Sequence, residues 1–270
     1  MDDFFTARRI KTGYASHTVL ENLDFSLAEG TVTGLLGANG SGKSTLLKAV
    51  CGLIPYSGEF LLRGVPLKGM SVRRLACQIS YVPQRSGINS SLPALDVVLM
   101  GFNPVLGLLR DADAGQRELA REALAAVGLK NLEERDYRTL SEGQKQLCIL
   151  ARTMVEDTRL LLLDEPDSAL DFRNRNLVPG ILRRLLEGGG KAALLCLHDP
   201  FLALDFCDRL ILLKGGRCMA CLVPARDSLG DMQEALSELY GPLFLARCPD
   251  GKGRMRLVLL PEISPGGYGE

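Results

Sequence analysis

The stretch Gly37-Ala-Asn-Gly-Ser-Gly-Lys-Ser-Thr45 decides the fold of this chain, and it directly follows the apolar run Thr31 to Leu36. It matches the pattern G-x-x-x-x-G-K-[ST] and lies between an expected strand and an expected helix over residues 44–50. The three glycines let the backbone curl tightly enough to point several N–H groups at one anion. The stretch therefore predicts a phosphate-binding loop with these contacting residues: Gly37, Asn39, Gly40, Ser41, Gly42, Lys43, Ser44 and Thr45.

Two side chains of the loop add chemistry to this backbone cradle. Lys43 begins the following helix and can reach the terminal phosphates, while the positive end of the helix faces the same anion. The hydroxyl of Ser44 is placed to ligate a magnesium ion. A glycine-rich turn that merely links strand to helix is the alternative, and the complete nine-residue pattern argues against it.

The composition is that of an ordinary globular protein. The chain has 270 residues, of which 46% are hydrophobic, and 32 basic residues balance 32 acidic ones. No overall basic excess points to nucleic acid. No stretch approaches the roughly 18 apolar residues that span a bilayer, and the start Met1-Asp2-Asp3-Phe4 lacks the features of a signal peptide. We therefore expect a cytoplasmic protein without nucleic-acid partners.

Strand patterns of two kinds predict the fold class. Residues Phe5 to Ala28 alternate apolar and polar side chains, as antiparallel strands do. The segments Arg159 to Leu163 and Ala192 to Leu197 are almost wholly apolar, as parallel strands covered on both faces require, and a helix is expected over Asp171 to Leu186 between them. We predict an α/β fold with a mostly parallel sheet and an N-terminal antiparallel β subdomain, with the ligand at the carboxyl ends of the parallel strands.

The remaining segments suggest how the chain is divided. From Ser86 to about Leu140 the pattern is predominantly helical, with helices expected over 94–101 and 113–127. We predict a main domain over residues 1–225 with a helical subdomain inserted at about 86–158. A small extension of one helix and two strands over 226–263 and a disordered tail over 264–270 complete the prediction.

Two carboxylates follow an apolar strand in Leu160-Leu-Leu-Leu-Asp164-Glu165. Asp164 can hold magnesium beside Ser44, and Glu165 is placed to polarise a water molecule towards the terminal phosphate. An Asp-Glu pair after a strand is by itself usually a solvated helix cap. The phosphate-binding loop makes the catalytic interpretation the stronger one.

The stretch Leu140-Ser-Glu-Gly-Gln144 resembles the Leu-Ser-Gly-Gly-Gln signature of ATP-binding cassette ATPases. Other segments are similar to further motifs of that family: Gln84 to its Q-loop, Ser168 to Asp171 to its D-loop, and His198 to its switch histidine. The resemblance covers about residues 5 to 225. It departs at Glu142, whose carboxylate would repel nearby phosphates by about 1 kcal/mol or more. We expect this side chain to turn outward.

The resemblance implies a homodimer in which two ATP molecules, each with magnesium, lie between the phosphate loop of one chain and the signature of the other. Ser141, Gly143 and Gln144 would then contact the ATP of the partner chain. The remaining implied roles are adenine stacking for Tyr14, a magnesium contact for Gln84, communication between the sites for Asp171, and a γ-phosphate contact for His198 beside the catalytic Glu165. A lone histidine is ordinarily a core side chain, but His198 ends an apolar strand.

The resemblance extends to a role in transport. A chain without a membrane span needs separate permease subunits, and Ala94 to Leu109 and the turn Leu239-Tyr240-Gly241 look like the ATPases of importers for iron-siderophore complexes, haem and cobalamin. Such a subunit would lie on the inner face of the cell membrane and act indirectly with a substrate-binding protein. The apolar residues of Ala94 to Leu109 suit a partner helix, but they could equally pack within the subdomain. A soluble ATPase for an assembly process, such as iron-sulfur cluster formation, is the alternative function, whereas the signature and switch histidine exclude a kinase.

The eight cysteines are mostly scattered through apolar segments, which is typical of small core residues in a reducing compartment. Cys218-Met-Ala-Cys221 is the exception, because a C-x-x-C can bind zinc or perform redox chemistry. No second C-x-x-C or histidine pair lies near it. We therefore expect these two cysteines to pack within a strand.

Overall fold

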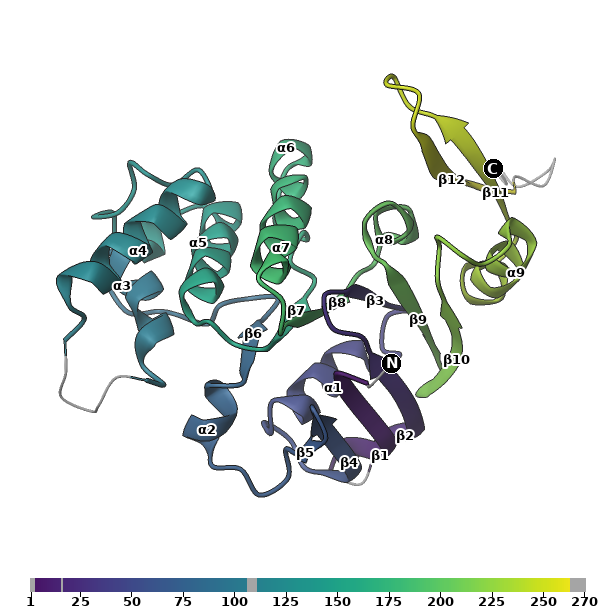
Figure 1. Ribbon diagram of the computed structural model, residues 1–270, viewed down its shortest axis with the longest axis horizontal. Helices are drawn as coiled ribbons and strands as arrows, with labels where there is room; N and C mark the ends of the chain where they lie inside the picture. The colour runs from purple at the N-terminus through teal and green to yellow at the C-terminus, as the bar shows by residue number, and fades with distance from the viewer. Residues whose placement is uncertain (1–2, 16, 106–110, 263–270) are drawn as a thin grey trace, which may run out of the picture.

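The computed structural model describes residues 3–15, 17–105 and 111–262. An antiparallel sheet with strand order β2-β1-β4-β5 forms one edge of the molecule (Figure 1). Its strands are β1 (Phe5–Tyr14), β2 (His17–Leu27), β4 (Tyr56–Leu62) and β5 (Val65–Pro66). The alternation of apolar and polar residues over Phe5 to Ala28 predicted β1 and β2 correctly.

A second sheet of six strands, in the order β10-β9-β3-β8-β7-β6, crosses the middle of the molecule. Five of its strands run parallel, and only β10 is antiparallel to its neighbour. The strands are β3 (Val32–Gly37), β6 (Ile79–Val82), β7 (Leu160–Asp164), β8 (Ala192–Cys196), β9 (Arg209–Lys214) and β10 (Arg217–Leu222). The mostly parallel α/β sheet of the prediction is confirmed.

This sheet separates two hydrophobic cores, because successive side chains of a strand point to opposite faces. On β7, Leu161 and Leu163 join one core, and Leu160 and Leu162 join the other. The first core also contains residues of α3 (Ala94–Leu99), α4 (Ala114–Ala126), α5 (Glu142–Val155), α7 (Leu177–Glu187), α8 (Pro200–Phe206) and α9 (Leu229–Tyr240). The second core lies between α1 (Lys43–Val50) and the antiparallel sheet. Helices α1 and α5 therefore cover opposite faces of the six-stranded sheet (Figure 1).

The shorter elements connect these layers. They are α2 (Val72–Ala76), the 3₁₀ turns η1 (Met100–Phe102) and η2 (Tyr137–Thr139), α6 (Phe172–Arg175), and the hairpin of β11 (Leu243–Pro249) and β12 (Met255–Pro261). The hairpin follows α9 at the end of the molecule farthest from α3 and α4 (Figure 1). The predicted tail over 264–270 lies outside the described residues.

One expected helix is interrupted at a single residue, Asn176, which itself keeps helical backbone angles of φ −72° and ψ −10°. The segment Asp171 to Leu186 forms two helices, α6 and α7, separated at Asn176. Pro179 explains the break, since it has no N–H to donate to the carbonyl of Arg175, and its ring crowds that carbonyl. The periodicity of the apolar residues continues across the break, so this pattern alone predicted one continuous helix.

The apolar residues of Ala94 to Leu109 mostly face inward. Ala94, Leu95, Val97, Val98, Leu99 and Phe102 are all at most 8% exposed. Of the described apolar residues in this segment, Val105 is the strongly exposed one, at 64%. The alternative that this segment packs within its own helices is thus confirmed for most of it, and residues 106–109 lie outside the described part.

A part-buried ion pair joins α5 to the edge of the large sheet. Arg152 Nε lies 3.0 Å from Glu156 Oε1, Ser80 Oγ donates to the same carboxylate, and Arg152 Nη2 donates to the carbonyl of Tyr81 at 3.3 Å. Burial raises the pKa of Glu156, and the charge of Arg152 opposes that shift. The guanidinium therefore compensates a carboxylate that would otherwise be costly to bury.

Replacement of this arginine is expected to destabilise the fold. Arg152→Leu leaves Glu156 without its counter-charge, and we expect the free energy of unfolding to fall by about 2–3 kcal/mol. Arg121→Leu, which removes surface ion pairs with Glu118 and Glu133, should cost less than about 1 kcal/mol. Urea unfolding followed by circular dichroism compares the two variants. Equal losses of stability would show that the Arg152 pair contributes no more than a surface pair.

Candidate active site

The loop between β3 and α1 has the curled backbone that its glycines permit. Gly40 and Gly42 have φ values of 78° and 103°, in the region that favours glycine. A Cβ on Gly37 would lie 2.6 Å from the carbonyl oxygen of Leu213 on β9, so a side chain there would force the neighbouring strand away. Ser41 Oγ is buried and has no hydrogen-bond partner among the described residues. An unsatisfied buried hydroxyl in such a loop fits a phosphate oxygen as its missing partner.

Lys43 lies inside the loop and is only 5% exposed. Its Nζ donates to the carbonyl oxygens of Gly37 at 2.6 Å and Ala38 at 3.3 Å. Burial lowers the pKa of Lys43, while the negative charges of Glu165 and Asp164 oppose that shift. The ammonium group is thereby aimed along the loop, where it can meet the terminal phosphates of a nucleotide.

Ser44 and Asp164 meet at the carboxyl end of the parallel sheet. Ser44 Oγ donates to Asp164 Oδ1 at 2.9 Å, and the hydroxyl of Tyr81 lies 3.4 Å from Asp164 Oδ2. Burial raises the pKa of Asp164, and the hydrogen bond from Ser44 counters this. A hydroxyl and a carboxylate side by side form the hard oxygen donor set that Mg²⁺ prefers, so these residues fit the metal that the sequence implied.

Glu165 follows Asp164 directly and is held by two groups. Gln84 Nε2 donates to Glu165 Oε2 at 2.6 Å, and His198 Nε2 contacts Glu165 Oε1. The backbone of Glu165 has φ 51°, an unfavourable value for a residue other than glycine that costs about 1 kcal/mol or more. The chain bends there so that this buried carboxylate meets the ends of β6 and β8. The structure thus brings together Gln84, Glu165 and His198, which are far apart in the sequence.

The signature begins α5. Ser141 caps the helix by accepting from the backbone N–H of Gln144 at 3.2 Å, and the Gln144 side chain accepts from the N–H of Ser141 at 3.0 Å. A Cβ on Gly143 would lie 2.9 Å from the carbonyl oxygen of Ala169, which explains the glycine. This packing joins the signature to the D-loop segment, where Asp171 caps α6 by accepting from the N–H of Asn174 at 2.8 Å.

Glu142 turns away from the helix end. Its side chain is 72% exposed, and it forms an ion pair of 2.8 Å with Lys145 one turn along α5. Its negative charge near a helix N-terminus is favourable, and the lysine compensates it. The outward orientation agrees with the expectation from the sequence.

We expect the departure at this signature position to have little effect on turnover. Glu142→Gly should change the rate of ATP hydrolysis by less than about threefold, because the exposed carboxylate is already paired with Lys145. The measurement is phosphate release at saturating ATP, with Glu118→Gly on α4 as the matched surface variant. A rate that rises tenfold or more would mean that the carboxylate acts against the nucleotide.

Tyr14 ends β1 opposite His17 of β2 and is 46% exposed. The start of β2 lies near the phosphate loop, because His17 and Asn39 line one cavity of about 470 Å³. An exposed aromatic ring at this place is available for stacking on a base.

Two residues near the site were missed from the sequence. Tyr81 reaches Asp164 because β6 and β7 pair in parallel register. Tyr240 of α9 approaches the phosphate loop, and its hydroxyl lies close enough to the backbone of Gly37 for that backbone to lower its pKa. Burial raises the pKa of Tyr240 to about 12. Neither contact has a local sequence signal, since both depend on pairing between distant segments.

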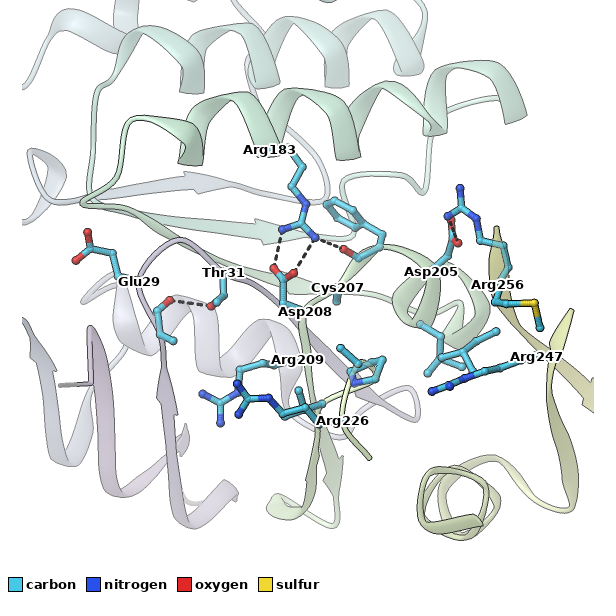
Figure 2. Close-up of a pocket in the computed structure, with 18 residues that line it drawn as sticks. Glu29, Thr31, Arg183, Asp205, Cys207, Asp208, Arg209, Arg226, Arg247 and Arg256 are labelled. Carbon is cyan, nitrogen blue, oxygen red and sulfur yellow. Dashed lines mark hydrogen bonds and ion pairs between the residues drawn. The ribbon is translucent and has the colours of Figure 1, made fainter. Parts of the chain in front are cut away.

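A separate cavity of about 780 Å³ lies between α8, β9 and the β11–β12 hairpin (Figure 2). Several arginines line it, and two of them are held by carboxylates. Arg183 pairs with Asp208 at 2.7 Å and Arg256 with Asp205 at 2.5 Å. None of the described residues of the phosphate loop or of the Glu165 cluster lines this cavity, so it has no part in the nucleotide site.

Comparison with known proteins identifies the site. The family model described as ABC transporter matches residues 20–168, more than half of the chain. The chain belongs to the ATP-binding cassette (ABC) transporter family. It is therefore an ABC ATPase that binds and hydrolyses ATP, and the loop from Gly37 to Thr45 lies within the matched region.

Relatives of this ABC ATPase include several import proteins. The achromobactin transport ATP-binding protein CbrD of Dickeya dadantii is 34% identical over 82% of this chain and 82% of its own length. The hemin import ATP-binding protein HmuV of Bordetella bronchiseptica is 38% identical over 87% of this chain and 91% of its own length. A solved structure described as a metal-chelate type ABC transporter in an inward-facing conformation superposes with a TM-score of 0.80. It is 25% identical and covers 97% of this chain and 98% of that chain.

No helix in the described part of this ABC ATPase combines the length and the apolar character needed to cross a bilayer. Partnership with membrane permease subunits is the general arrangement of import ATPases in the family.

Proposed function

We propose that this chain is the ATP-hydrolysing subunit of an importer for an iron complex, either a siderophore or haem, or for cobalamin. The observation that carries the proposal is the cluster of Gln84, Glu165 and His198 at the phosphate-loop edge of the sheet, in a chain whose relatives are named for achromobactin and hemin transport. The cluster supplies the machinery for hydrolysis, and the relatives supply the class of cargo.

Each residue then has a role at the nucleotide. The loop residues and Lys43 bind the phosphates. Ser44, Asp164 and Gln84 would hold Mg²⁺, which would neutralise charge on the phosphate oxygens. Glu165 accepts a proton from the attacking water, and His198 orients Glu165 and contacts the γ-phosphate. Tyr14 stacks on the adenine ring.

The site within one chain is half of a site. The signature Ser141 to Gln144 begins α5, whereas the phosphate loop leads into α1 on the opposite face of the sheet. Among the described residues, no hydrogen bond or ion pair joins the signature to the phosphate loop. We therefore propose a head-to-tail homodimer, in which the signature and Asp171 of one copy complete the ATP site of the other.

The importer also needs a surface for its permease. Val72 on α2 and Val105 are 86% and 64% exposed, and their segments are joined because Arg73 Nε donates to the carbonyl of Pro104 at 2.8 Å. These apolar side chains offer a place for a permease helix close to the strand that leads to Gln84. A peripheral position on the inner face of the membrane follows from this docking. We also propose that residues 1–225 form a main domain with an inserted helical part, and that a C-terminal extension follows it.

A pull-down from detergent-solubilised membranes tests this function. The tagged chain should recover a polytopic membrane protein, and Val105→Asp should reduce that recovery without altering ATP hydrolysis by the isolated chain. Leu53→Asp, at another exposed apolar residue, is the matched control and should recover the partner normally. Recovery of soluble partners alone would instead support an assembly ATPase.

The cargo is tested in cells that lack this chain. Uptake of at least one of three labelled compounds, an iron-siderophore complex, haem or cobalamin, should fall and should return with the native chain but not with Glu165→Gln. Unchanged uptake of all three would contradict the proposed cargo class while leaving the ATPase assignment intact.

A further inference from the structure

Strand β10 carries two cysteines that do not merely pack within the sheet. Cys218 is half-buried, Cys221 is exposed, and their sulfur atoms lie 3.6 Å apart. The pair lies at the edge of the six-stranded sheet, outside the cluster around Glu165. Cys218 packs against the neighbouring hydrophobic core, as expected from the sequence, and its sulfur also contacts that of the exposed Cys221.

A bulge in β10 brings the two thiols together. Residues three apart on a regular strand point to opposite faces of the sheet. Here Cys218 pairs with Leu213 and Cys221 with Ile211, and the register shifts between Cys218 and Ala220. Ile211 and Leu213 are two residues apart on β9 and belong to the same core. The extra residue in the bulge, Met219, thus places both cysteines on the same face.

The two thiols have unequal environments. The hydrogen bond between the two thiols lowers the pKa of Cys221, burial opposes this shift, and the positive charge of Arg209 adds to the lowering. Arg209 lies on β9 beside this strand (Figure 2). The pKa of Cys218 is raised, chiefly by its hydrogen bond with Cys221 and then by burial. Cys221 is thus the more nucleophilic and the more accessible thiol, and Cys218 lies where it can react with Cys221 in a second step.

We propose that Cys218 and Cys221 form a redox-active dithiol that a peroxide oxidises to an intramolecular disulfide. The Cys221 thiolate attacks one peroxide oxygen, the O–O bond breaks, and protonation of the leaving oxygen gives water and a sulfenic acid on Cys221. The Cys218 sulfur then attacks the Cys221 sulfur, the S–O bond breaks, and a second water leaves with the Cys218 proton. In total, two thiols and one hydrogen peroxide give one disulfide and two waters.

The geometry favours this chemistry over a structural metal site. The sulfurs need to close from 3.6 Å to the about 2.05 Å of a disulfide bond, which local adjustment of an edge strand can supply. A structural zinc site needs four ligands, and no group of three or more His, Cys, Asp or Glu residues suited to a metal occurs in the described chain.

Peptide mapping tests the proposal on the reduced, full-length protein. Arg217 and Arg226 flank the pair, so trypsin releases both cysteines in one peptide, residues 218–226. After treatment with hydrogen peroxide and alkylation, this peptide should have lost two hydrogen atoms and carry no alkyl group on its cysteines, and dithiothreitol should reverse the change. Before oxidation at pH 7, iodoacetamide should modify Cys221 severalfold faster in the folded protein than in urea.

Single variants separate the two roles. Cys218→Ser should leave a sulfenic acid on Cys221 that dimedone captures, whereas Cys221→Ser should abolish both the disulfide and that label on the peptide. Cys248, an exposed cysteine on β11, serves as the internal control and should form no intramolecular disulfide. If both cysteines of the native peptide remain open to alkylation while Cys248 is oxidised, or if Cys221 pairs with a cysteine other than Cys218, the proposal is overturned.

Discussion

Glu165→Gln is expected to lower the rate of ATP hydrolysis by about 100- to 10,000-fold, the usual contribution of a positioned general base. The amide keeps the size of the carboxylate and can still contact Gln84 and His198, so the site should stay folded. It cannot accept a proton from water. ATP affinity should therefore remain within about threefold of the native value, since the phosphate contacts come from the loop.

Phosphate release and nucleotide titration measure these two quantities separately. Glu118→Gln, which removes a negative charge from the exposed face of α4, is the matched control and should hydrolyse ATP at the native rate. Native turnover by Glu165→Gln would remove this carboxylate from the role of base. A parallel loss of ATP binding would instead assign it to the cradle for the nucleotide.

Lys43→Ala is expected to weaken ATP binding by roughly 100-fold, because a charge-assisted hydrogen bond to phosphate contributes about 2–3 kcal/mol. The substitution also leaves the carbonyl oxygens of Gly37 and Ala38 without the donor that lies 2.6 Å and 3.3 Å away. The loop should then lose its fixed curvature. This variant and Glu165→Gln thus separate binding from hydrolysis.

Isothermal titration with ATP and Mg²⁺ provides the measurement for Lys43→Ala. Lys68→Ala, at an exposed position before α2, is the control for the loss of one positive charge and should bind normally. Unaltered affinity in Lys43→Ala would contradict the placement of the ammonium group at the phosphates.

Local patterns predicted most of the fold correctly, because those patterns have direct physical causes. The alternation in residues 5–28 reflects a sheet with one buried face, and the wholly apolar strand before Asp164 reflects a sheet covered on both faces. The glycines of the loop indicate positive φ angles that other residues rarely adopt. Each of these patterns reflects the structure of its own strand or loop and does not depend on contacts with distant segments.

The contacts that the sequence could not predict depend on pairing between segments that are far apart in the chain. Tyr81 reaches Asp164 only through the register of β6 against β7, and Tyr240 reaches Gly37 only because α9 folds back towards the loop. The bulge at Met219 likewise depends on how β10 pairs with β9. The break before α7 was in principle readable, since Pro179 cannot continue the hydrogen bonding of α6.

The central claim is that two copies of the chain complete each ATP site. Sedimentation of Glu165→Gln with and without ATP tests it most directly, because slow hydrolysis preserves any ATP-bound dimer. We predict a monomer without nucleotide, a dimer with ATP, and a return to monomer when Ser141→Arg blocks the signature in the same chain. A Glu165→Gln protein that binds ATP and still sediments as a monomer would contradict the claim.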